Sequence, residues 1–144
     1  MINSLLSSPT TAMLERTLNF TEQRHQMILA NIANVDTPGY RQQDVSVSEF
    51  RKSLASALER QHSANNTHTT PEDTDTVSFL DHGSTAVQLK TRAASSAQPF
   101  YDRGAHSMED LMSQLADNAQ AHNMAAAFLK GRNDMLQKAI TMRP

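Results

Sequence analysis

Apolar residues recur at heptad spacing near both ends of this chain, while its middle lacks any such repeat. Residues 9–61 and 107–141 are periodic, whereas residues 62–106 are polar and aperiodic. A long polar segment cannot by itself bury enough apolar surface to offset the entropy of ordering it. The sequence therefore predicts an all-α fold in which the long N- and C-terminal helices form an antiparallel coiled-coil hairpin, with an extended or partly disordered middle segment.

We accordingly divide the 144 residues into three parts. Residues 1–61 hold the N-terminal helix, a turn motif and a short second helix. Residues 62–106 form a polar linker region, in which Val77–Leu80 and Ala86–Leu89 are short candidate strands. Residues 107–144 form the C-terminal coiled-coil helix. Much of the apolar composition is alanine, which buries little surface, so the sequence does not favour a compact enzyme core.

The N-terminal helix is predicted to begin with Ser8 as its N-cap and Pro9 at its first helical position, where the missing N–H is harmless. Its seam advances alternately by four and three residues, which is the spacing of a heptad repeat. The positions between seam residues are polar and include Arg16, Gln23 and Arg24, which are predicted to face solvent. An isolated helix would leave its stripe exposed and therefore needs a partner. The seam residues are Leu14, Leu18, Thr21, His25, Ile28, Ile32 and Val35.

A tight turn is predicted directly after this helix. Asn34 tolerates the left-handed conformation at a helix end, and Pro38 disfavours helix at Thr37. The segment Thr37–Tyr40 predicts a type II turn, because Pro38 fixes φ at the second position and Gly39 supplies a positive φ at the third.

A short second helix is predicted from Ser46 to about Gln61. Ser46 and Glu49 have the spacing of a capping box, in which each side chain bonds the backbone N–H of the other residue. Spacings of three and four residues place the apolar side chains on one face of this helix. They are Val47, Phe50, Leu54, Ala57 and Leu58.

The C-terminal helix is predicted to begin at Ser107 and to run for about 35 residues, or ~52 Å at 1.5 Å per residue. Its seam contains one additional four-residue step, a stutter that would locally unwind a supercoil. Gly131 costs about 1 kcal/mol against alanine inside a helix, so we expect close packing at that position. The two seams can be completed within the chain or by neighbouring subunits, and the sequence leaves both alternatives open. The seam residues are Met108, Leu111, Leu115, Ala119, His122, Ala126, Leu129, Asn133, Leu136 and Ile140.

The composition excludes several classes of site. Thirteen Lys and Arg against fifteen Asp and Glu give a net charge of −2, which provides no basic stripe for nucleic acid. The absence of cysteine excludes thiolate metal sites and cysteine nucleophiles. We interpret His25 and His122, both on seam positions, as interfacial residues that tune packing or register. We place Glu72, Asp73 and Asp75 in a solvated loop. The sequence therefore predicts no catalytic residue, no metal site and no cofactor.

No stretch of the chain approaches the ~20 apolar residues that a membrane-spanning helix needs. Its first residues lack both a basic region and the apolar run of ~7–15 residues that is typical of a secretory signal. We therefore expect no transmembrane segment and no cleaved signal peptide.

The run Asn31-Ile32-Ala33-Asn34-Val35-Asp36-Thr37-Pro38-Gly39-Tyr40-Arg41 closely resembles the N-terminal signature of bacterial flagellar rod, hook and hook-associated proteins. The resemblance covers about residues 14–50 and 107–142 and leaves the middle of the chain out. The flanking residues and the short total length are most similar to the proximal rod members of the family. The residues that carry the turn motif are Asn31, Asn34, Asp36, Thr37, Pro38, Gly39 and Tyr40.

The resemblance implies a structural subunit of the periplasmic rod in the flagellar basal body. Such subunits use their terminal helices as a coiled-coil hairpin that packs helically with neighbours into a hollow tube, and the flagellar type III apparatus exports them without a cleaved signal peptide. The implied partners are other copies of the chain, other rod proteins, the MS-ring and export-gate base, and a rod-base adaptor. The implied assembly seam comprises Leu14, Leu18, His25, Ile28, Ile32, Leu111, Leu115, His122, Leu129, Leu136 and Ile140.

Two other classes of function are alternatives to a rod subunit. A soluble helical-hairpin adaptor or export chaperone would fold alone and remain monomeric or dimeric. An enzyme has no residue in this sequence to carry its chemistry.

Overall fold

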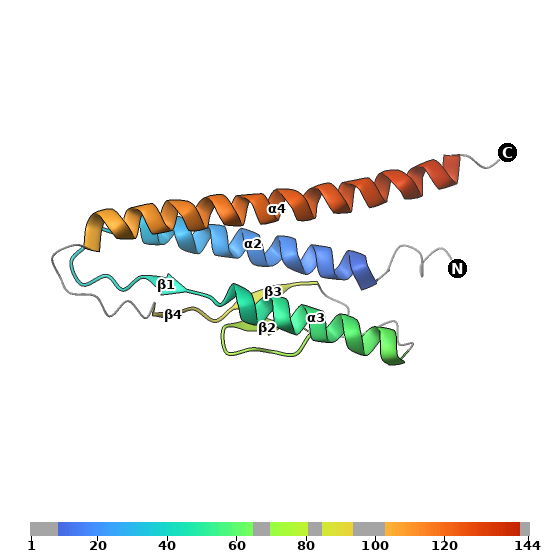
Figure 1. Cartoon of the computed structure of the whole chain (residues 1–144), viewed down its shortest axis with the longest axis horizontal. Coiled ribbons are helices and arrows are strands. Elements are labelled where there is room, and N and C mark those ends of the chain that lie inside the picture. Colours follow the sequence, from blue (N-terminus) through green and yellow to red (C-terminus); the bar gives the residue numbers. More distant parts are fainter. Residues whose placement is uncertain (1–8, 65–69, 81–84, 94–102, 142–144) are drawn as a thin grey trace.

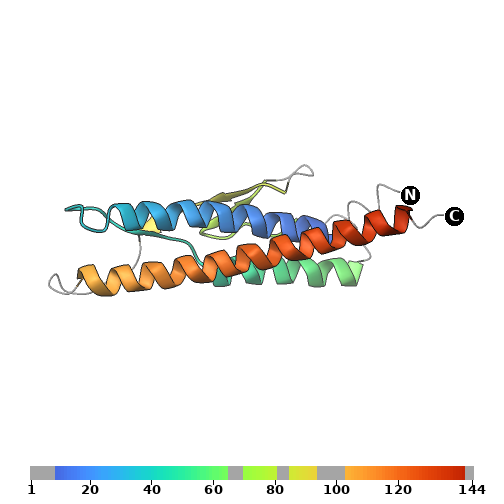
Figure 2. The same cartoon turned by 90° about the horizontal axis from the view of Figure 1, so that it is seen from above.

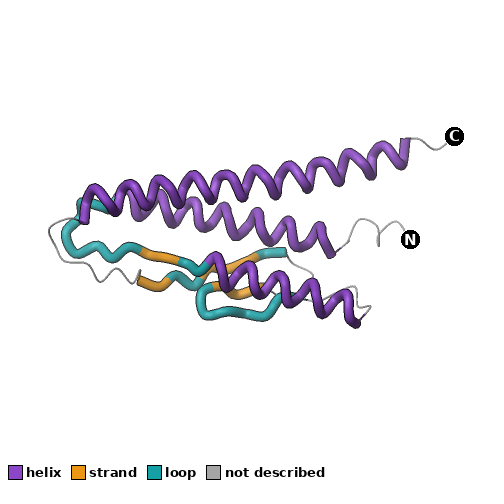
Figure 3. The backbone as a smooth tube through the Cα atoms, viewed as in Figure 1, coloured by secondary structure: helices purple, strands orange, loops and turns teal. Residues whose placement is uncertain are grey.

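The computed structural model describes residues 9–64, 70–80, 85–93 and 103–141. The described part of the chain is mostly helical, and Figure 3 shows long helices beside very short strands. In chain order the elements are α2 (Pro9–Ala33), β1 (Gln43–Asp44), α3 (Val47–Ala64), β2 (Val77–Phe79), β3 (Val87–Leu89), β4 (Arg92–Ala93) and α4 (Arg103–Thr141).

The elements form three layers, with α2 in the middle. Helix α4 lies along one side of α2, while α3 and the strands lie on the other (Figure 1). The view from above shows α2 and α4 side by side over most of the length of α2 (Figure 2). They are antiparallel, because Thr21 contacts His122 and Arg24 contacts Asn118. The predicted hairpin of terminal helices is therefore present within one chain, whereas its coiled-coil geometry stays a prediction.

The helix limits follow the sequence signals closely. Helix α2 begins at Pro9 as predicted, while its predicted N-cap, Ser8, lies outside the described residues. At α3 the Ser46 hydroxyl accepts a hydrogen bond from the Glu49 N–H at 3.2 Å, as an N-cap requires. Helix α4 begins at Arg103, four residues before the predicted start. None of the helices among the described residues is long and apolar enough to span a membrane.

The middle of the chain departs from the predicted all-α fold, because it contributes short strands and part of the core. Strands β2 and β3 pair antiparallel, with Phe79 opposite Val87, and β1 pairs antiparallel with β4. The candidate strands are thus confirmed, and Val77, Phe79 and Val87 are buried. The sequence argument failed here because it considered the segment alone, whereas α2 and α3 supply the surface that covers these three side chains.

Three stacked phenylalanine rings join the layers. Phe20 of α2 stacks on Phe50 of α3 with ring centroids 3.9 Å apart. The ring centroids of Phe50 and Phe79 of β2 are 6.0 Å apart. Stacked aromatic pairs contribute beyond the area that they bury. The core is therefore centred between α2, α3 and β2, and only the start of α4 reaches it. Its buried members are Phe20, Met27, Ile28, Val45, Phe50, Val77, Phe79, Val87 and Leu111.

Side chains of α2 cover the outer edge of β3. The Gln23 carboxamide donates to the Val87 carbonyl and accepts from the Leu89 N–H, so it bonds β3 as a neighbouring strand would. One turn earlier, the Asn19 amide donates to the Thr85 carbonyl at 3.2 Å. The prediction that Gln23 faces solvent is therefore wrong, because its side chain satisfies strand groups that would otherwise be unpaired.

Candidate assembly interface

The signature run forms the turn that the sequence predicts. Gly39 has φ of +80°, and the Tyr40 N–H donates to the Thr37 carbonyl at 3.2 Å, as a type II turn requires. The Thr37 N–H in turn bonds the Asn34 carbonyl at the end of α2. Residues 36–39 are exposed at this end of the molecule. The glycine is needed because most other residues adopt this backbone conformation only with strain.

Asn31 holds the two sides of the turn together. Its side chain is 2% exposed, and its amide donates to the Gln43 carbonyl at 2.7 Å. Its oxygen accepts from the Gln43 N–H at 2.9 Å and from the Tyr40 hydroxyl at 3.0 Å. Asn31 therefore pairs with β1 as a strand residue would, which gives a structural reason for an asparagine and a tyrosine nine residues apart.

The buried side of α4 keeps an uninterrupted heptad pattern. Leu111, Asn118 and Ala125 are buried and lie seven residues apart. The predicted stutter disappears because Asn118, Ala125 and Arg132 take the seam positions that were assigned to their neighbours Ala119, Ala126 and Asn133. The polarity of Asn118 hid it from an apolar pattern. The buried and half-buried positions that step by three and four are Met108, Leu111, Leu115, Asn118, His122, Ala125, Leu129, Arg132 and Leu136.

A polar layer, which we define as Thr21, Arg24, Asn118 and His122, joins α2 to α4. The Asn118 amide donates to the Thr21 carbonyl at 2.8 Å, and the Arg24 guanidinium approaches the Asn118 oxygen at 3.5 Å. Thr21 Oγ1 lies 2.9 Å from His122 Nδ1. His122, which was interpreted as an interfacial residue that tunes packing or register, therefore bonds Thr21 at the interface.

Arg24 and Arg16 are buried, so the prediction that they face solvent is wrong. Burial lowers the pKa of the Arg24 guanidinium, while the carboxylates of Asp44 and Asp117 act in the opposite direction. The side chain remains charged, since arginine is not deprotonated in proteins. The middle layer of the molecule thus encloses a cation between its neighbouring helices and strands.

The predicted seam residues differ widely in their surroundings. Ile28 and Leu111 are buried in the core of the chain, whereas Ile140 is 70% exposed. The others have intermediate exposure: Leu14, Leu18, His25, Ile32, Leu115, His122, Leu129 and Leu136. That these residues contact a neighbouring subunit stays a prediction. Ile28 and Leu111 already pack against other residues of the same chain.

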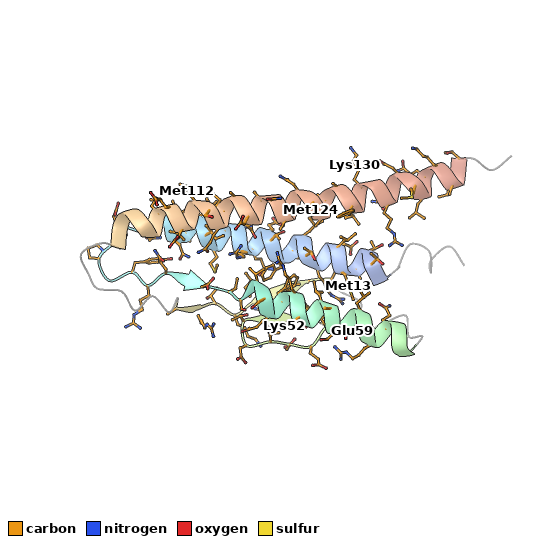
Figure 4. The ribbon with its side chains drawn as sticks, viewed as in Figure 1. Met13, Lys52, Glu59, Met112, Met124 and Lys130 are labelled. Carbon is orange, nitrogen blue, oxygen red and sulfur yellow. The ribbon has the colours of Figure 1, made fainter. Side chains whose placement is uncertain are left out.

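An exposed apolar stripe on α4, which we define as Met124, Phe128 and Met135, lies beside the seam that packs against α2. Spacings of four and seven residues place the three side chains on one face of the helix, and Phe128 and Met135 are 61% and 71% exposed. Figure 4 shows Met124 on this helix, with Met112 nearer its start. Sequence reasoning missed this stripe because its residues fall outside the seam, although their spacing was visible.

Close packing does not explain Gly131. A Cβ atom built at this position would meet nothing within 4 Å, and the residue is exposed. The predicted local reason is therefore wrong, and nothing in the structure explains this glycine.

The carboxylates of Glu72, Asp73 and Asp75 are exposed in the loop before β2. Glu72 and Asp75 are exposed, and Glu72 pairs with Arg60 at 2.7 Å. The Asp73 carboxylate accepts from the Phe79 N–H at 2.8 Å, so it closes the loop before β2. Within residues 9–64, 70–80, 85–93 and 103–141, no three acidic or histidine side chains are grouped to hold a metal ion.

Comparison with known proteins decides the family. The chain is 31% identical over 128 residues to the flagellar basal body rod protein FlgB of Salmonella typhimurium strain LT2, covering 85% of this chain and 89% of that protein. The chain belongs to the FlgB family of flagellar basal body rod proteins. The FlgB proteins of Escherichia coli strain K12 and of Shigella flexneri are each 29% identical to it over 119 residues, covering 82% of this chain and 83% of theirs. No protein-family model matches the chain.

Proposed function

We propose that the chain is a structural subunit of the proximal rod of the bacterial flagellar basal body. In this proposal it assembles helically with other copies and other rod proteins and connects the MS ring and export gate to the drive shaft for motility. A rod-base adaptor is a further partner, and the flagellar type III apparatus exports the chain without cleaving a signal peptide. Membership of the FlgB family supports the rod assignment.

The observation that carries this proposal is the exposed apolar stripe on α4. Monomeric proteins rarely leave a row of large apolar side chains in water unless it serves an interaction. Met124, Phe128 and Met135 form such a row on a helix that packs against α2 through other positions. Methionine side chains adapt to neighbours of different shape, which suits contacts with several kinds of subunit.

The end of α4 supplies a second uncovered surface. Arg24 contacts Asn118 in the antiparallel pair, so Pro9 comes opposite residue 133, and α4 continues about 12 Å further at 1.5 Å per residue. Figure 1 shows this overhang beyond the first residue of α2. Ile140 continues the seam into the overhang, where it is exposed. A neighbouring subunit would complete the seam there.

The alternative of a helical-hairpin adaptor or export chaperone is not favoured. The three similar proteins all have names of rod proteins, and none is named as an adaptor or a chaperone. Nothing in the described geometry supports a catalytic role.

The test replaces the stripe by serine in the triple variant Met124→Ser, Phe128→Ser, Met135→Ser. We expect the free energy of unfolding of the purified chain to change little, because the three side chains are exposed. In a bacterium that lacks its own copy of the gene, the variant should be exported but should fail to restore rods and swimming. Motility plates and electron microscopy of basal bodies provide the readout.

The matched control is Gln120→Ser, Asn123→Ser, Gln137→Ser, which changes three exposed polar positions of the same helix. The control should restore rods and swimming. Normal rods built from the stripe variant would contradict the proposal, as would an equal loss of rods in both variants.

A further inference from the structure

Side-chain hydrogen bonds between α2 and α4 lie in the polar layer. Asn118 is 3% exposed, and its amide and oxygen both have partners on α2, at Thr21 and Arg24. Thr21 Oγ1 approaches His122 Nδ1 as well as the Thr17 and Leu18 carbonyls of its own helix. The Asn118 side chain keeps these hydrogen bonds only when the two helices are correctly aligned along their lengths.

The remainder of the seam specifies that alignment weakly. Around the polar layer α4 carries small side chains at Ala119, Ala121, Ala125 and Ala126. Small side chains interlock little, so a shift by one heptad changes their packing only slightly. The same shift would carry Asn118 from Thr21 toward Leu14 or Ile28, one heptad away on α2. A buried amide opposite an apolar side chain loses its hydrogen bonds and is strongly disfavoured.

We propose that Asn118, Arg24, Thr21 and His122 set the register of α2 against α4 and thereby fix how far α4 projects beyond α2. They are positioning residues for the overhang, and the use of the overhang by a neighbour rests on the proposed function. The register itself is a property of the single chain. A buried polar residue on an otherwise small or apolar seam has this effect in coiled coils, where it fixes register at a cost in stability.

The register can be measured by cross-linking, because the natural chain contains no cysteine. Thr21 contacts His122, and the helices are antiparallel. Leu14, seven residues before Thr21, is therefore expected opposite Leu129, seven residues after His122. The pair Leu14→Cys, Leu129→Cys reports this native register. The pair Leu14→Cys, Leu136→Cys reports a register shifted by one heptad. Both pairs occupy half-buried seam positions and are compared in the purified full chain under mild oxidation.

Asn118→Leu is introduced into each cysteine pair. With Asn118 present, the native pair should form the disulfide and the shifted pair should not. Asn118→Leu should raise the ratio of shifted to native product about tenfold, which corresponds to about 1.4 kcal/mol. Asn118→Gln, which retains the amide, should keep the ratio closer to that of the natural chain. The matched control Leu115→Ala alters a half-buried apolar seam position and should leave the ratio unchanged.

An unchanged ratio in Asn118→Leu, with helical circular dichroism retained, would overturn the proposal. If Asn118→Leu loses its helical signal, Asn118→Ser in the same pairs decides: shifted product supports the proposal and native product alone overturns it. This assay uses the chain before assembly, so its failure leaves the rod assignment intact. Conversely, failure of the stripe variant to build rods supports the rod function and does not test the register.

Discussion

The two contacts made by helix α2 differ in chemistry. Toward α3 and β2 it presents Phe20, which stacks in a row of aromatic rings. Toward α4 it presents Thr21 and Arg24, which meet Asn118 and His122. The first contact is aromatic, whereas the second combines apolar seam residues such as Leu111 with a polar layer whose hydrogen bonds depend on alignment.

This difference shows how one short chain can have its own core and still leave apolar surface exposed. The aromatic side of α2 gives the subunit its own core, which includes residues from the middle segment. Helix α4 is longer than α2 and packs against it along only part of its length, with apolar side chains exposed beside the seam and at its end. In the proposed function, stability depends mainly on the core around α2 and assembly on the uncovered surface of α4, so substitutions should separate the two.

The largest effect is expected on the aromatic side. Phe20→Ala removes a buried ring that stacks on Phe50, and it should lower the free energy of unfolding by about 3–5 kcal/mol. Urea unfolding followed by circular dichroism measures the change. Phe128→Ala, at an exposed position of α4, is the matched control and should change this free energy by no more than about 0.5 kcal/mol. Equal losses for the two variants would show that the core does not lie where the structure places it.

An intermediate effect is expected at the signature turn. Asn31→Ala removes three hydrogen bonds to Tyr40 and Gln43 and should cost about 1–3 kcal/mol of unfolding free energy. Asn34→Ala serves as control, because the Asn34 side chain bonds only nearby groups, the Ala30 carbonyl one turn back and, at 3.5 Å, the Thr37 hydroxyl. Thermal denaturation of both variants compares them. A larger loss for Asn34→Ala than for Asn31→Ala would refute the assigned role of Asn31.

The smallest effect is expected on the polar side of α2. His122→Ala removes one bond to the Thr21 hydroxyl, which still lies 2.9 Å from two carbonyls of its own helix. The loss should therefore be about 0.5–1.5 kcal/mol, and the exposed neighbour Asn123→Ala should show no loss. A loss above that of Phe20→Ala would reverse the comparison between the two contacts.

Local signals predicted the helices and the turn well. Pro9, Ser46 and Gly39 each have a specific backbone role, and the structure confirms all three. The signature run led to the correct family before any geometry was known. These features were accessible because each depends on residues that are near one another in the sequence.

Features that depend on distant residues were not accessible. The polar segment was expected to lack a core, yet Val77, Phe79 and Val87 are covered by helices from elsewhere in the chain. Arg24 was placed in solvent because its charge was considered without its neighbours. Asn118 was overlooked because a seam is recognised by apolar residues, and a buried amide is revealed only by its partners on the other helix.

Amide hydrogen exchange along α4 tests the central claim most directly, namely that neighbours complete the part of this helix that extends beyond α2. In the isolated chain, amides of residues 134–141 should exchange faster than those of residues 111–125, which pack against α2. In purified basal bodies, exchange of residues 134–141 should slow markedly while residues 111–125 change little. Equal exchange of residues 134–141 before and after assembly would contradict the account.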